Sequence, residues 1–401
     1  MDKADLCVKC GLCLPHCPTY QLTQNEAESP RGRIALMQSM ANGLLQPSAK
    51  LAGHLDNCLG CRSCEAVCPA QVPYGELIDA GRTALHDQQA SRNRWLQRLA
   101  PWFLLPARRR LLAHCLRFYQ RCGLQSLARA LLPRNAALGR LAAMLPPLTA
   151  APRRGQHPAG NADAPKVQLF TGCVSELADA QVLKDSIYVL KRCGFDVELP
   201  ASQGCCGALH QHAGMAAEAQ QQFNNNLAVF GETEQPILGT ATGCTATLRE
   251  YALYTPHASA FSARVSDINS FVARHWNTDL PVAPLRGRAL VQEPCSLRNV
   301  LGDAQAIYTL LRCIPELDVR PLDGNQQCCG AAGSMMITAA TQADALLQKK
   351  LDSVTATQAD YVVSSNIGCA MHLAGGLRRA RVNAQVIHPI SLLAQQLRLS
   401  E

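Results

Sequence analysis

The sequence lacks the features that mark several common classes of protein. It has no uncharged apolar stretch long enough to cross a bilayer, so a membrane contact would have to be peripheral. Its first residues, MDKADLCVKCGLC, lack the apolar core and small-residue cleavage site of a secretory signal, and we therefore expect a reducing, cytoplasmic setting. The patterns G-x-G-x-x-G, G-x-x-x-x-G-K-[ST] and H-E-x-x-H are also missing. The chain thus has no visible motif of its own for a flavin, a nicotinamide or a phosphate.

Lysine, aspartate and glutamate are absent from residues 91–162, a segment that contains thirteen arginines. The formal charge of +8 is therefore concentrated there, and the rest of the chain is net acidic. That charge also counts every cysteine as neutral, although metal-bound cysteines are thiolates. The net charge gives no reason to expect a nucleic-acid partner, whereas the arginine-rich segment is a real local patch.

The same segment is rich in leucine and alanine and is broken by prolines, which predicts short helices and not a globular domain. One face of a predicted helix carries Leu111, Cys115, Phe118 and Cys122. In one interpretation this helix lies on an anionic membrane, with Trp95 and Trp102 at the level of the headgroups. In the other it is a connector that packs on the rest of the chain or on a partner subunit, and the sequence leaves both open.

Cysteine is abundant, with 20 residues in a chain of 401. Dense cysteine in a reducing compartment indicates metal or redox chemistry. Two runs of the form C-x2-C-x2-C-x3-C-P lie near the N-terminus, where three closely spaced thiolates can bind one cubane cluster and the fourth cysteine reaches the other cluster. The first predicted [4Fe-4S] cluster is bound by Cys7, Cys10, Cys13 and Cys68. The second is bound by Cys58, Cys61, Cys64 and Cys17, and a pair of zinc sites is the alternative.

An internal repeat follows, and each copy alternates strands with helices. The segment KVQLFTGC (166–173) matches RALVQEPC (288–295), and each predicts a short buried strand that ends in cysteine. Both copies continue with a helix, a second strand, a Cys-Cys-Gly loop, a further helix and a strand that leads to Gly-Cys. This order predicts two α/β units with short parallel sheets, whose loops converge at the carboxyl ends of the strands.

Each copy has four cysteines at matching positions. The first set is Cys173, Cys205, Cys206 and Cys244, and the second is Cys295, Cys328, Cys329 and Cys369. A vicinal pair can direct both sulfurs to one cluster where the backbone bends sharply, and Gly207 and Gly330 permit that bend. We predict one further iron–sulfur cluster per repeat, with a strained vicinal disulfide or structural zinc as alternatives.

The chain is therefore expected to have several domains. An α-helical dicluster ferredoxin module is followed by a basic helical connector and two tandem α/β Cys-Cys-Gly repeats. The expected boundaries are 1–84 for the module, 85–165 for the connector and linker, 166–280 for the first repeat and 281–401 for the second.

A tandem Cys-Cys-Gly repeat behind an eight-cysteine ferredoxin module resembles the iron–sulfur subunits of heterodisulfide reductases and of membrane-associated dehydrogenases, including glycolate oxidase and anaerobic glycerol-3-phosphate dehydrogenase. The resemblance rests on SPRGRI at 29–34, QGCCGA, QCCGAAG and SNIGCAMHL, and it covers essentially the whole chain. It implies an electron-transfer subunit without catalytic residues of its own. Its expected partners are FAD-containing subunits that oxidise a 2-hydroxy acid such as glycolate, and a quinone, at the inner face of the cytoplasmic membrane.

The sequence departs from heterodisulfide reductases at one position in each repeat. That family ends the repeat in C-x2-C, whereas Thr247 and His372 stand three residues after the last cysteine here. The fifth thiolate is missing, so each repeat has an ordinary four-ligand site unless His372 is an additional ligand. A heterodisulfide-reductase-like catalytic subunit, an iron–sulfur subunit of a lactate or glycerol-3-phosphate dehydrogenase, and a zinc-stabilised scaffold remain the alternative functions.

Other candidate residues are interpreted more plainly. Cys115 and Cys122 are predicted to be apolar helix positions, and Cys193 and Cys313 to be core residues. None of the histidines nearest the sites, His210, His212 and His388, is expected to be a ligand. Arg31 and Arg33 lie between the two cysteine runs, where they could donate hydrogen bonds to cluster sulfides, contact a partner or simply begin a helix.

Overall fold

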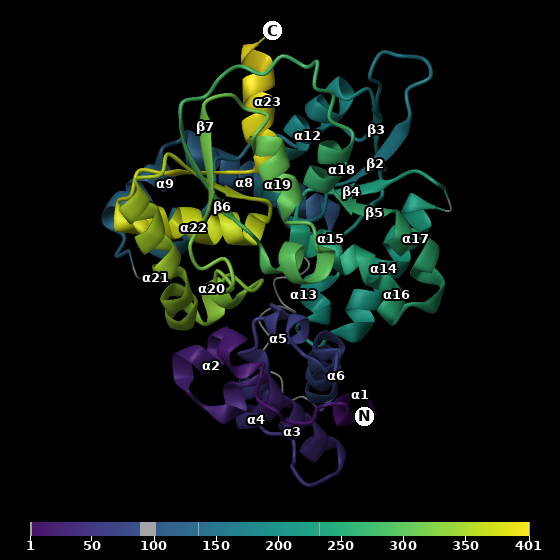
Figure 1. Cartoon of the computed structure of the whole chain (residues 1–401), viewed down its shortest axis with the longest axis vertical. Coiled ribbons are helices and arrows are strands. Elements are labelled where there is room, and N and C mark those ends of the chain that lie inside the picture. The colour runs from purple at the N-terminus through teal and green to yellow at the C-terminus, as the bar shows by residue number, and fades with distance from the viewer. Residues whose placement is uncertain (1, 89–101, 135, 232, 401) are drawn as a thin grey trace.

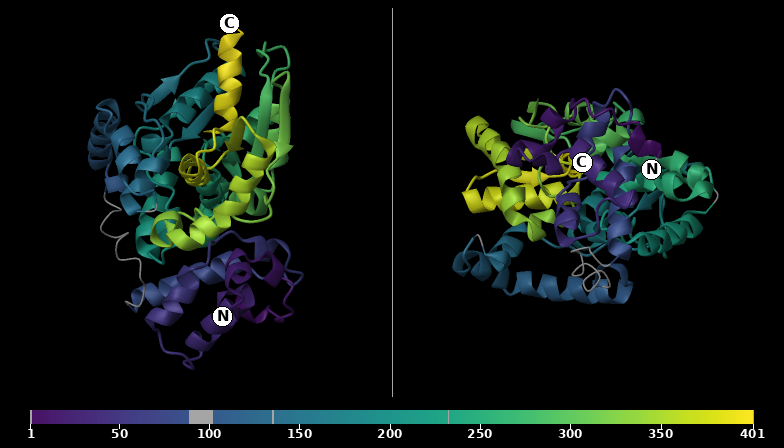
Figure 2. Two further views of the ribbon diagram at one scale, coloured as in Figure 1. Left: turned by 90° about the vertical axis from the view of Figure 1, so that its left-hand side faces the viewer. Right: turned by 90° about the horizontal axis from the view of Figure 1, so that it is seen from below.

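The structure is a computed structural model that describes residues 2–88, 102–134, 136–231 and 233–400. A helical module occupies one end of the molecule, and two α/β units form the larger body above it (Figure 1). The connector helices lie along one side of this body in both views of Figure 2. The predicted fold class, a helical dicluster module followed by a helical connector and two α/β repeats, is confirmed.

The N-terminal module consists of short helices joined by cysteine-bearing loops. Its elements are α1 (Asp2–Asp5), η1 (Leu14–His16), α2 (Pro18–Thr23), η2 (Glu26–Glu28), α3 (Pro30–Ala41), α4 (Ala49–Asp56), α5 (Ser63–Ala66) and α6 (Tyr74–Asp87). Helix α3 begins where Ser29 accepts a hydrogen bond from the Gly32 amide, with proline at the first helical position. Apolar side chains on α3, α4 and α6 form one small core beside the cysteines.

The connector consists of three helices, α8 (Pro106–Arg121), α9 (Leu124–Leu131) and α10 (Ala137–Met144). It contacts both repeats: Arg109 pairs with Glu176 of the first at 2.6 Å, and Arg140 pairs with Asp344 of the second. The face predicted on α8 is exposed, with Leu111 at 56% and Phe118 at 66%. Trp102 is exposed as well, whereas Trp95 lies outside the described residues.

The first repeat contains a five-stranded sheet in the order β1-β3-β2-β4-β5. Its strands are β1 (Gly155–His157), β2 (Lys166–Phe170), β3 (Asp196–Leu199), β4 (Ile237–Gly239) and β5 (Val265–Asp267). Its helices are α11 (Val174–Ala178), α12 (Ala180–Arg192), α13 (Ala208–Gln211), α14 (Ala216–Phe230), α15 (Thr242–Arg249), α16 (Tyr251–Tyr254), η3 (Pro256–Ala258), α17 (Ser259–Arg264) and α18 (Ile268–Arg274). Strand β1 pairs antiparallel with β3, so the segment expected to be connector and linker, 85–165, also contains an edge strand of this sheet. Its sequence GQH has no apolar alternation that could have predicted it.

The second repeat contains a four-stranded parallel sheet in the order β7-β6-β8-β9. Its strands are β6 (Gly287–Gln292), β7 (Leu317–Pro321), β8 (Tyr361–Ser364) and β9 (Gln385–Ile387). Its helices are η4 (Leu297–Leu301), α19 (Gln305–Leu311), α20 (Met335–Thr338), α21 (Ala340–Thr357), α22 (Ile367–Ala380) and α23 (Pro389–Leu399). Strands β2 to β5 of the first sheet follow the same order as β6 to β9, which matches the internal repeat read from the sequence.

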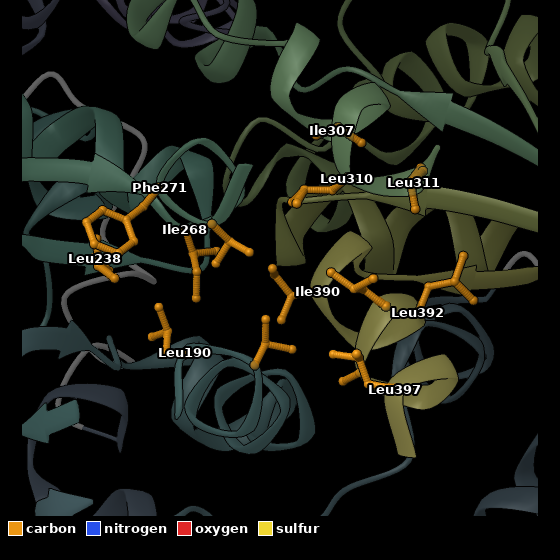
Figure 3. Packing of buried hydrophobic residues seen from close by; sticks show 14 of the residues in the cluster. Leu190, Leu238, Ile268, Phe271, Ile307, Leu310, Leu311, Ile390, Leu392 and Leu397 are labelled. Carbon is orange, nitrogen blue, oxygen red and sulfur yellow. The ribbon is translucent and has the colours of Figure 1, made fainter. Parts of the chain in front are cut away.

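The two repeats share one apolar core, shown in Figure 3. Ile268 and Phe271 from α18 face Ile307 and Leu310 from α19, and Ile390 of α23 lies between the two units. Burial of each such side chain contributes about 1.5–3 kcal/mol. At the rim, Arg398 of the second repeat pairs with the buried Asp185 of the first at 2.8 Å. The packing of the repeats against each other is thus part of their folding.

Candidate metal centres

A small cavity inside the helical module is bordered by thiols from both cysteine runs. Its volume is about 20 Å³, and the cysteines that line it are Cys17, Cys58, Cys61 and Cys64. These are the four residues that the sequence assigned to the second cluster. Cys17, the N-cap residue of α2, is the member of the first run that lines this cavity.

Hydrogen-bonding groups surround the thiols of this cavity. Cys17 Sγ lies 3.3 Å from Thr19 Oγ1, and the Tyr74 hydroxyl donates to Cys58 Sγ at 3.7 Å. Burial raises the pKa of Cys61 to about 12, with the nearby Cys295 and Cys58 thiols adding to the shift, and burial raises that of Cys64 well above its usual value. Such thiols stay neutral unless a cationic group replaces their protons, and a bound iron–sulfur core is such a group.

The thiols assigned to the first cluster lie nearer the surface. Cys7, Cys13 and Cys68 border the module's apolar core, and Cys10 is exposed. Burial raises the pKa of Cys13, and the Cys7 and Cys17 thiols add to that effect while backbone amides of Arg31 and Cys13 oppose it. The first group is therefore the more accessible of the two from outside.

Arg31 and Arg33 have different surroundings. Arg33 is 1% exposed, forms an ion pair with Glu28 at 2.6 Å, and donates to Thr19 Oγ1 at 3.0 Å. It also borders the cavity, so it organises the interior of the module and is not available to a partner. Arg31 is partly exposed, pairs with Glu26 at 2.7 Å and donates to the Lys9 carbonyl within the first cysteine loop.

In the first repeat, four thiols from three separate segments form one continuous group. The Cys173 and Cys205 sulfurs are 3.3 Å apart, and side-chain hydrogen bonds connect Cys205 to Cys206 and Cys206 to Cys244. Three of them are at most 4% exposed. Gly207 has φ of +85°, and a Cβ there would lie 2.5 Å from the Phe223 ring. Glycine is needed because the backbone must turn sharply against that ring.

Two polar side chains that the sequence did not single out hold the Cys-Cys-Gly loop of this repeat. Asn226 donates to the Cys205 carbonyl at 2.7 Å, and the Tyr251 hydroxyl donates to the Cys206 carbonyl at 2.9 Å. Both side chains are completely buried. Asn226 lies within the polar run QQQFNNN, so nothing in its local pattern distinguishes it from exposed neighbours.

The second repeat gathers its four thiols in the same way. The Cys329 and Cys369 sulfurs are 3.0 Å apart, and side-chain hydrogen bonds connect Cys295 to Cys328 and Cys328 to Cys329. Gly330 has φ of +87°, and a Cβ there would lie 2.6 Å from the Ala343 carbonyl oxygen. Both predicted sets of four are thus brought together.

The last cysteine of each set lies on a helix and not, as expected, on a loop at the end of a strand. Cys244 belongs to the first turn of α15, and Cys369 to the first turn of α22. Asn366, at the N-cap of α22, donates to Cys369 Sγ at 3.5 Å. A helix start presents free amide groups that can donate hydrogen bonds to a ligand sulfur.

All twenty cysteines are free thiols, so neither Cys205–Cys206 nor Cys328–Cys329 forms the alternative vicinal disulfide. Among the described residues, no group of three or more His, Cys, Asp or Glu side chains is arranged to hold a single metal ion. The fit of three sets to iron–sulfur clusters therefore rests on the number, type, burial and grouping of their thiols, and that of Cys7, Cys10, Cys13 and Cys68 rests on their spacing in the sequence.

His372, the possible additional ligand, is buried on α22 one turn after Cys369. Its Nε2 lies 3.2 Å from the Ala343 carbonyl, and its Nδ1 has no hydrogen-bond partner among the described residues. Burial lowers the pKa of His372 to about 4, so the ring is neutral at physiological pH. The Nε2 contact leaves a ligand role to Nδ1 alone, and that role stays a prediction.

The other histidines have structural contacts. His388 caps α23 and contacts the Thr240 carbonyl, and His212 pairs with Asp79 of the helical module at 3.1 Å. His210 is buried, with its Nδ1 unpartnered in the described part of the chain.

The remaining cysteines lie outside the four sets. Cys115 and Cys122 are exposed on the connector. Cys193 packs partly buried against the shared core, whereas Cys313 is half-buried at the end of α19 and donates to the Thr309 carbonyl at 3.4 Å. The expectation of a core position thus holds better for Cys193 than for Cys313.

The connector also exposes a row of apolar side chains. On α9 and α10 these are Leu124, Leu127, Leu131, Leu138 and Leu141. No helix in the described ranges has both the length and the apolar character needed to span a membrane. The arginines of these two helices add little charge to the row, because Arg140 is buried against Asp344 and Arg129 donates to the Ala142 and Leu145 carbonyls. The exposed arginines of the connector helices include Arg108, Arg110 and Arg121 of α8.

Comparison with protein families and known proteins gives consistent matches. The family model "4Fe-4S dicluster domain" matches residues 3–72, and the model "Cysteine-rich domain" matches residues 167–249 and 289–374. The "Probable glycolate oxidase iron-sulfur subunit" of Bacillus subtilis (strain 168) is 30% identical, over 98% of this chain and 95% of the relative. The "Glycolate oxidase iron-sulfur subunit" of Escherichia coli (strain K12) is 29% identical, over 98% and 93%. "Lactate utilization protein A" of Bacillus velezensis is 27% identical, over 57% of this chain and 98% of the relative.

Proposed function

The chain belongs to the family of glycolate oxidase iron–sulfur subunits, and from this premise we propose that it is the electron-transfer subunit of a membrane-associated, FAD-dependent 2-hydroxy-acid dehydrogenase of the glycolate type. An FAD-containing partner subunit oxidises the hydroxy acid, and this chain conducts the electrons one at a time towards a quinone. No residue of this chain acts on the substrate. Its own residues bind the clusters, exclude water from them and fix their potentials.

The observation that carries this proposal is the grouping of twelve of the sixteen proposed ligand thiols. Four lie at each repeat site, and the module's second set lines one cavity. In the proposal, Cys7, Cys10, Cys13 and Cys68 hold one [4Fe-4S] cluster of the module, and Cys17, Cys58, Cys61 and Cys64 hold the other. The repeat sites hold one cluster each, and bound clusters supply reversible one-electron redox chemistry.

The protein groups around the repeat sites suit this task. The Gly207 amide donates to Cys205 Sγ at 3.4 Å, and the Gly330 amide donates to Cys328 Sγ at 3.5 Å. Hydrogen bonds to ligand sulfur stabilise the more negative, reduced state and so raise the potential, whereas burial opposes added negative charge. Because the same amide donates in each repeat, this hydrogen bond should affect the redox potentials of the two clusters alike. Differences between the two potentials should then come from the other surrounding side chains.

The connector is the proposed contact with the cytoplasmic face of the membrane. The exposed arginines of α8, Arg108, Arg110 and Arg121, attract anionic lipid, and the leucines of α9 and α10 can insert at the level of the headgroups. A place at the inner surface would bring the chain close to the quinone pool. The competing proposal, that this surface binds a partner subunit, is tested by vesicle flotation of the isolated chain with anionic and with neutral lipid.

A lactate-oxidising complex is the second candidate. Relatives named for lactate utilization cover 57% of this chain, whereas the relatives named as glycolate oxidase iron–sulfur subunits cover 98% of it. The wider coverage favours glycolate. Reduction of the chain by its reconstituted flavin partners, with glycolate and lactate offered separately, distinguishes the two substrates.

The proposed function is tested by measuring iron, acid-labile sulfide and zinc in anaerobically purified chain, with EPR spectra before and after dithionite reduction. We expect about sixteen iron and sixteen sulfide per chain, as four cubane clusters require. About eight iron and eight sulfide would mean that the repeats hold no iron–sulfur clusters. Stoichiometric zinc without iron would contradict electron transfer altogether.

A further inference from the structure

The helical module meets the second repeat at an apolar contact that contains thiols from both. Leu59 and Cys61 of the module pack against Cys328, Met335 and Leu346. Cys295 lies at the edge of the same contact, and the five central side chains are each at most 9% exposed. Water is therefore excluded between a thiol proposed to bind the module's second cluster and two thiols proposed to bind the cluster of the second repeat.

A polar side chain holds this contact together. Asn299 lies in η4, the helical turn that follows Cys295, and its amide donates to the Cys61 carbonyl at 2.6 Å and to Ser63 Oγ at 3.1 Å. The loop that contains Cys61 is thus attached to the turn that follows Cys295. The attachment fixes the distance between the two cysteine loops and adds no charge between them.

The contact of the module with the first repeat has a different character. There, Asp79 binds His212 at 3.1 Å and the Tyr254 hydroxyl at 3.0 Å, and Arg62 pairs with Glu250. The four thiols of the first repeat belong to an aromatic cluster that includes no residue of the module among the described residues. The first site is therefore separated from the module by polar pairs and by its own aromatic side chains.

The first site does adjoin the second repeat. Ser296, next to Cys295, donates to Thr242 Oγ1 at 3.0 Å, and the Thr242 amide donates to the Ser365 carbonyl at 3.1 Å. Thr242 begins α15, the helix that contains Cys244. The helix starts that carry the proposed ligands of the two repeats thus touch directly.

We infer that the electron relay passes between the module and the repeats at the contact of Cys61 with Cys295 and Cys328, so that the second repeat stands between the module and the first repeat. The inference rests on the proposed function. One electron crosses the contact: the cluster on one side is oxidised, the cluster on the other side is reduced, and no bond is made or broken. The flavin partner supplies this electron in the complex, and dithionite supplies it in the test.

Matched ligand variants test the inference without an activity assay. Cys369→Ala and Cys244→Ala remove corresponding ligands of the two repeats, each away from Cys61. In the full chain reduced with dithionite, we expect each variant to lose about four of sixteen iron atoms. Only Cys369→Ala should also narrow the EPR signal of the module's second cluster, because one of its magnetic neighbours is gone. The broadening caused by the module's other cluster should remain in both variants.

Each other outcome of this experiment has a defined meaning. If both variants lose iron but only Cys244→Ala sharpens the module's signal, or neither does, the inferred order is overturned and the proposed function stands. If neither variant loses iron, the repeats hold no clusters, and both the inference and that part of the proposed function fail.

A second pair of variants keeps every cysteine and covers the case in which a ligand variant does not fold. Asn299→Ala should weaken the spin–spin broadening at full iron content, because the loop that contains Cys61 is released. His212→Ala, at the contact with the first repeat, should leave the broadening unchanged. Equal effects of the two variants would contradict the inference.

Discussion

The two Cys-Cys-Gly repeats share the order of four parallel strands and the grouping of four thiols, but the side chains around their sites differ. The first site is enclosed by aromatic side chains, with Phe223 and Tyr251 ring centroids 4.3 Å apart and Tyr251 stacked on Phe261. The second site is enclosed by small and flexible apolar side chains, including Met144, Ala331, Met336 and Ala343. Both copies of the repeat thus have the same ligand pattern, whereas solvent access to each site and the redox potential of its cluster depend on surroundings that differ between the copies.

The largest effect is expected from removing one of the aromatic side chains that enclose the site of the first repeat. Phe223→Ala removes a ring that is 1% exposed and packs beside the Cys-Cys-Gly loop, so the free energy of unfolding should fall by about 3–5 kcal/mol. Chemical denaturation followed by circular dichroism measures the loss. Leu346→Ala is the control beside the site of the second repeat. If Leu346→Ala, and not Phe223→Ala, lowered the redox potential or the occupancy of the first repeat's cluster, the role given to the aromatic ring would be wrong.

The two loop glycines make the comparison sharper. Gly207→Ala and Gly330→Ala both require φ near +85°, which costs about 1–2 kcal/mol for a residue with a side chain. The added Cβ meets a side-chain ring in the first repeat but the Ala343 carbonyl oxygen in the second, and backbone yields less readily than a ring. Gly330→Ala should therefore lose more iron and stability than Gly207→Ala. Equal losses would show that conformation alone, and not the neighbour, determines the cost.

Removing one hydroxyl from the first site should have a smaller effect. Tyr251→Phe deletes the hydrogen bond to the Cys206 carbonyl and leaves Asn226 with one acceptor fewer, at a cost of about 1–3 kcal/mol. The change should shift the redox potential of the first repeat's cluster and leave that of the second unaltered, as measured by EPR-monitored titration. A potential shift confined to the cluster of the second repeat would contradict the assignment of Tyr251 to the site of the first repeat.

The smallest expected effect is a difference in pH dependence between the module's contacts with the first and with the second repeat. Burial lowers the pKa of His212, but the Asp79 carboxylate outweighs it and raises that pKa, and the pKa of Asp79 is lowered despite its burial because His212 and Arg82 oppose that effect. A raised histidine pKa adds stability that is present below the unfolded value near 6.5 and is lost as pH rises through the folded value. The lowered Asp79 pKa adds stability above about 4 that is lost in more acidic solution.

The contact with the first repeat should therefore be tightest between about pH 4 and 6.5 and loosen towards pH 8. The apolar contact at Cys61 contains no such ion pair and should change less over that range. Hydrogen exchange of α6 and α13 at pH 6 and pH 8 measures the difference. In His212→Asn the pH dependence should disappear, and its persistence would point to another titrating group.

Much of this architecture could be predicted from the sequence, because spacing determines it. The C-x2-C-x2-C-x3-C-P runs were enough to group Cys17 with Cys58, Cys61 and Cys64, the residues that line one cavity. The repeat predicted both α/β units and their thiol sets. Strand β1 and the helical positions of Cys244 and Cys369 were missed, because three polar residues show no alternation and a helix can begin directly after a strand.

Contacts between distant segments of the chain could not be predicted from sequence patterns. Asn226 and Tyr251 hold a loop about twenty to forty-five residues away in the chain, and Asn299 binds a carbonyl of another domain. Asn226 lies in a polar run, whereas Asn299 and Tyr251 have apolar and charged neighbours, so no shared local pattern marks the three and only the tertiary packing selects them. For the same reason the sequence could not tell that Arg33 is internal while Arg31 is partly exposed.

The apolar core shared by the two repeats has a consequence for how such a protein can be divided. Ile268 and Phe271 of the first repeat and Ile307 and Leu310 of the second each complete their burial on the other copy. A cut near residue 280 would expose both halves of this core to water, whereas a cut in the connector leaves it whole. The pair of repeats, and not the single repeat, is thus the smallest portion of the chain that keeps this core whole.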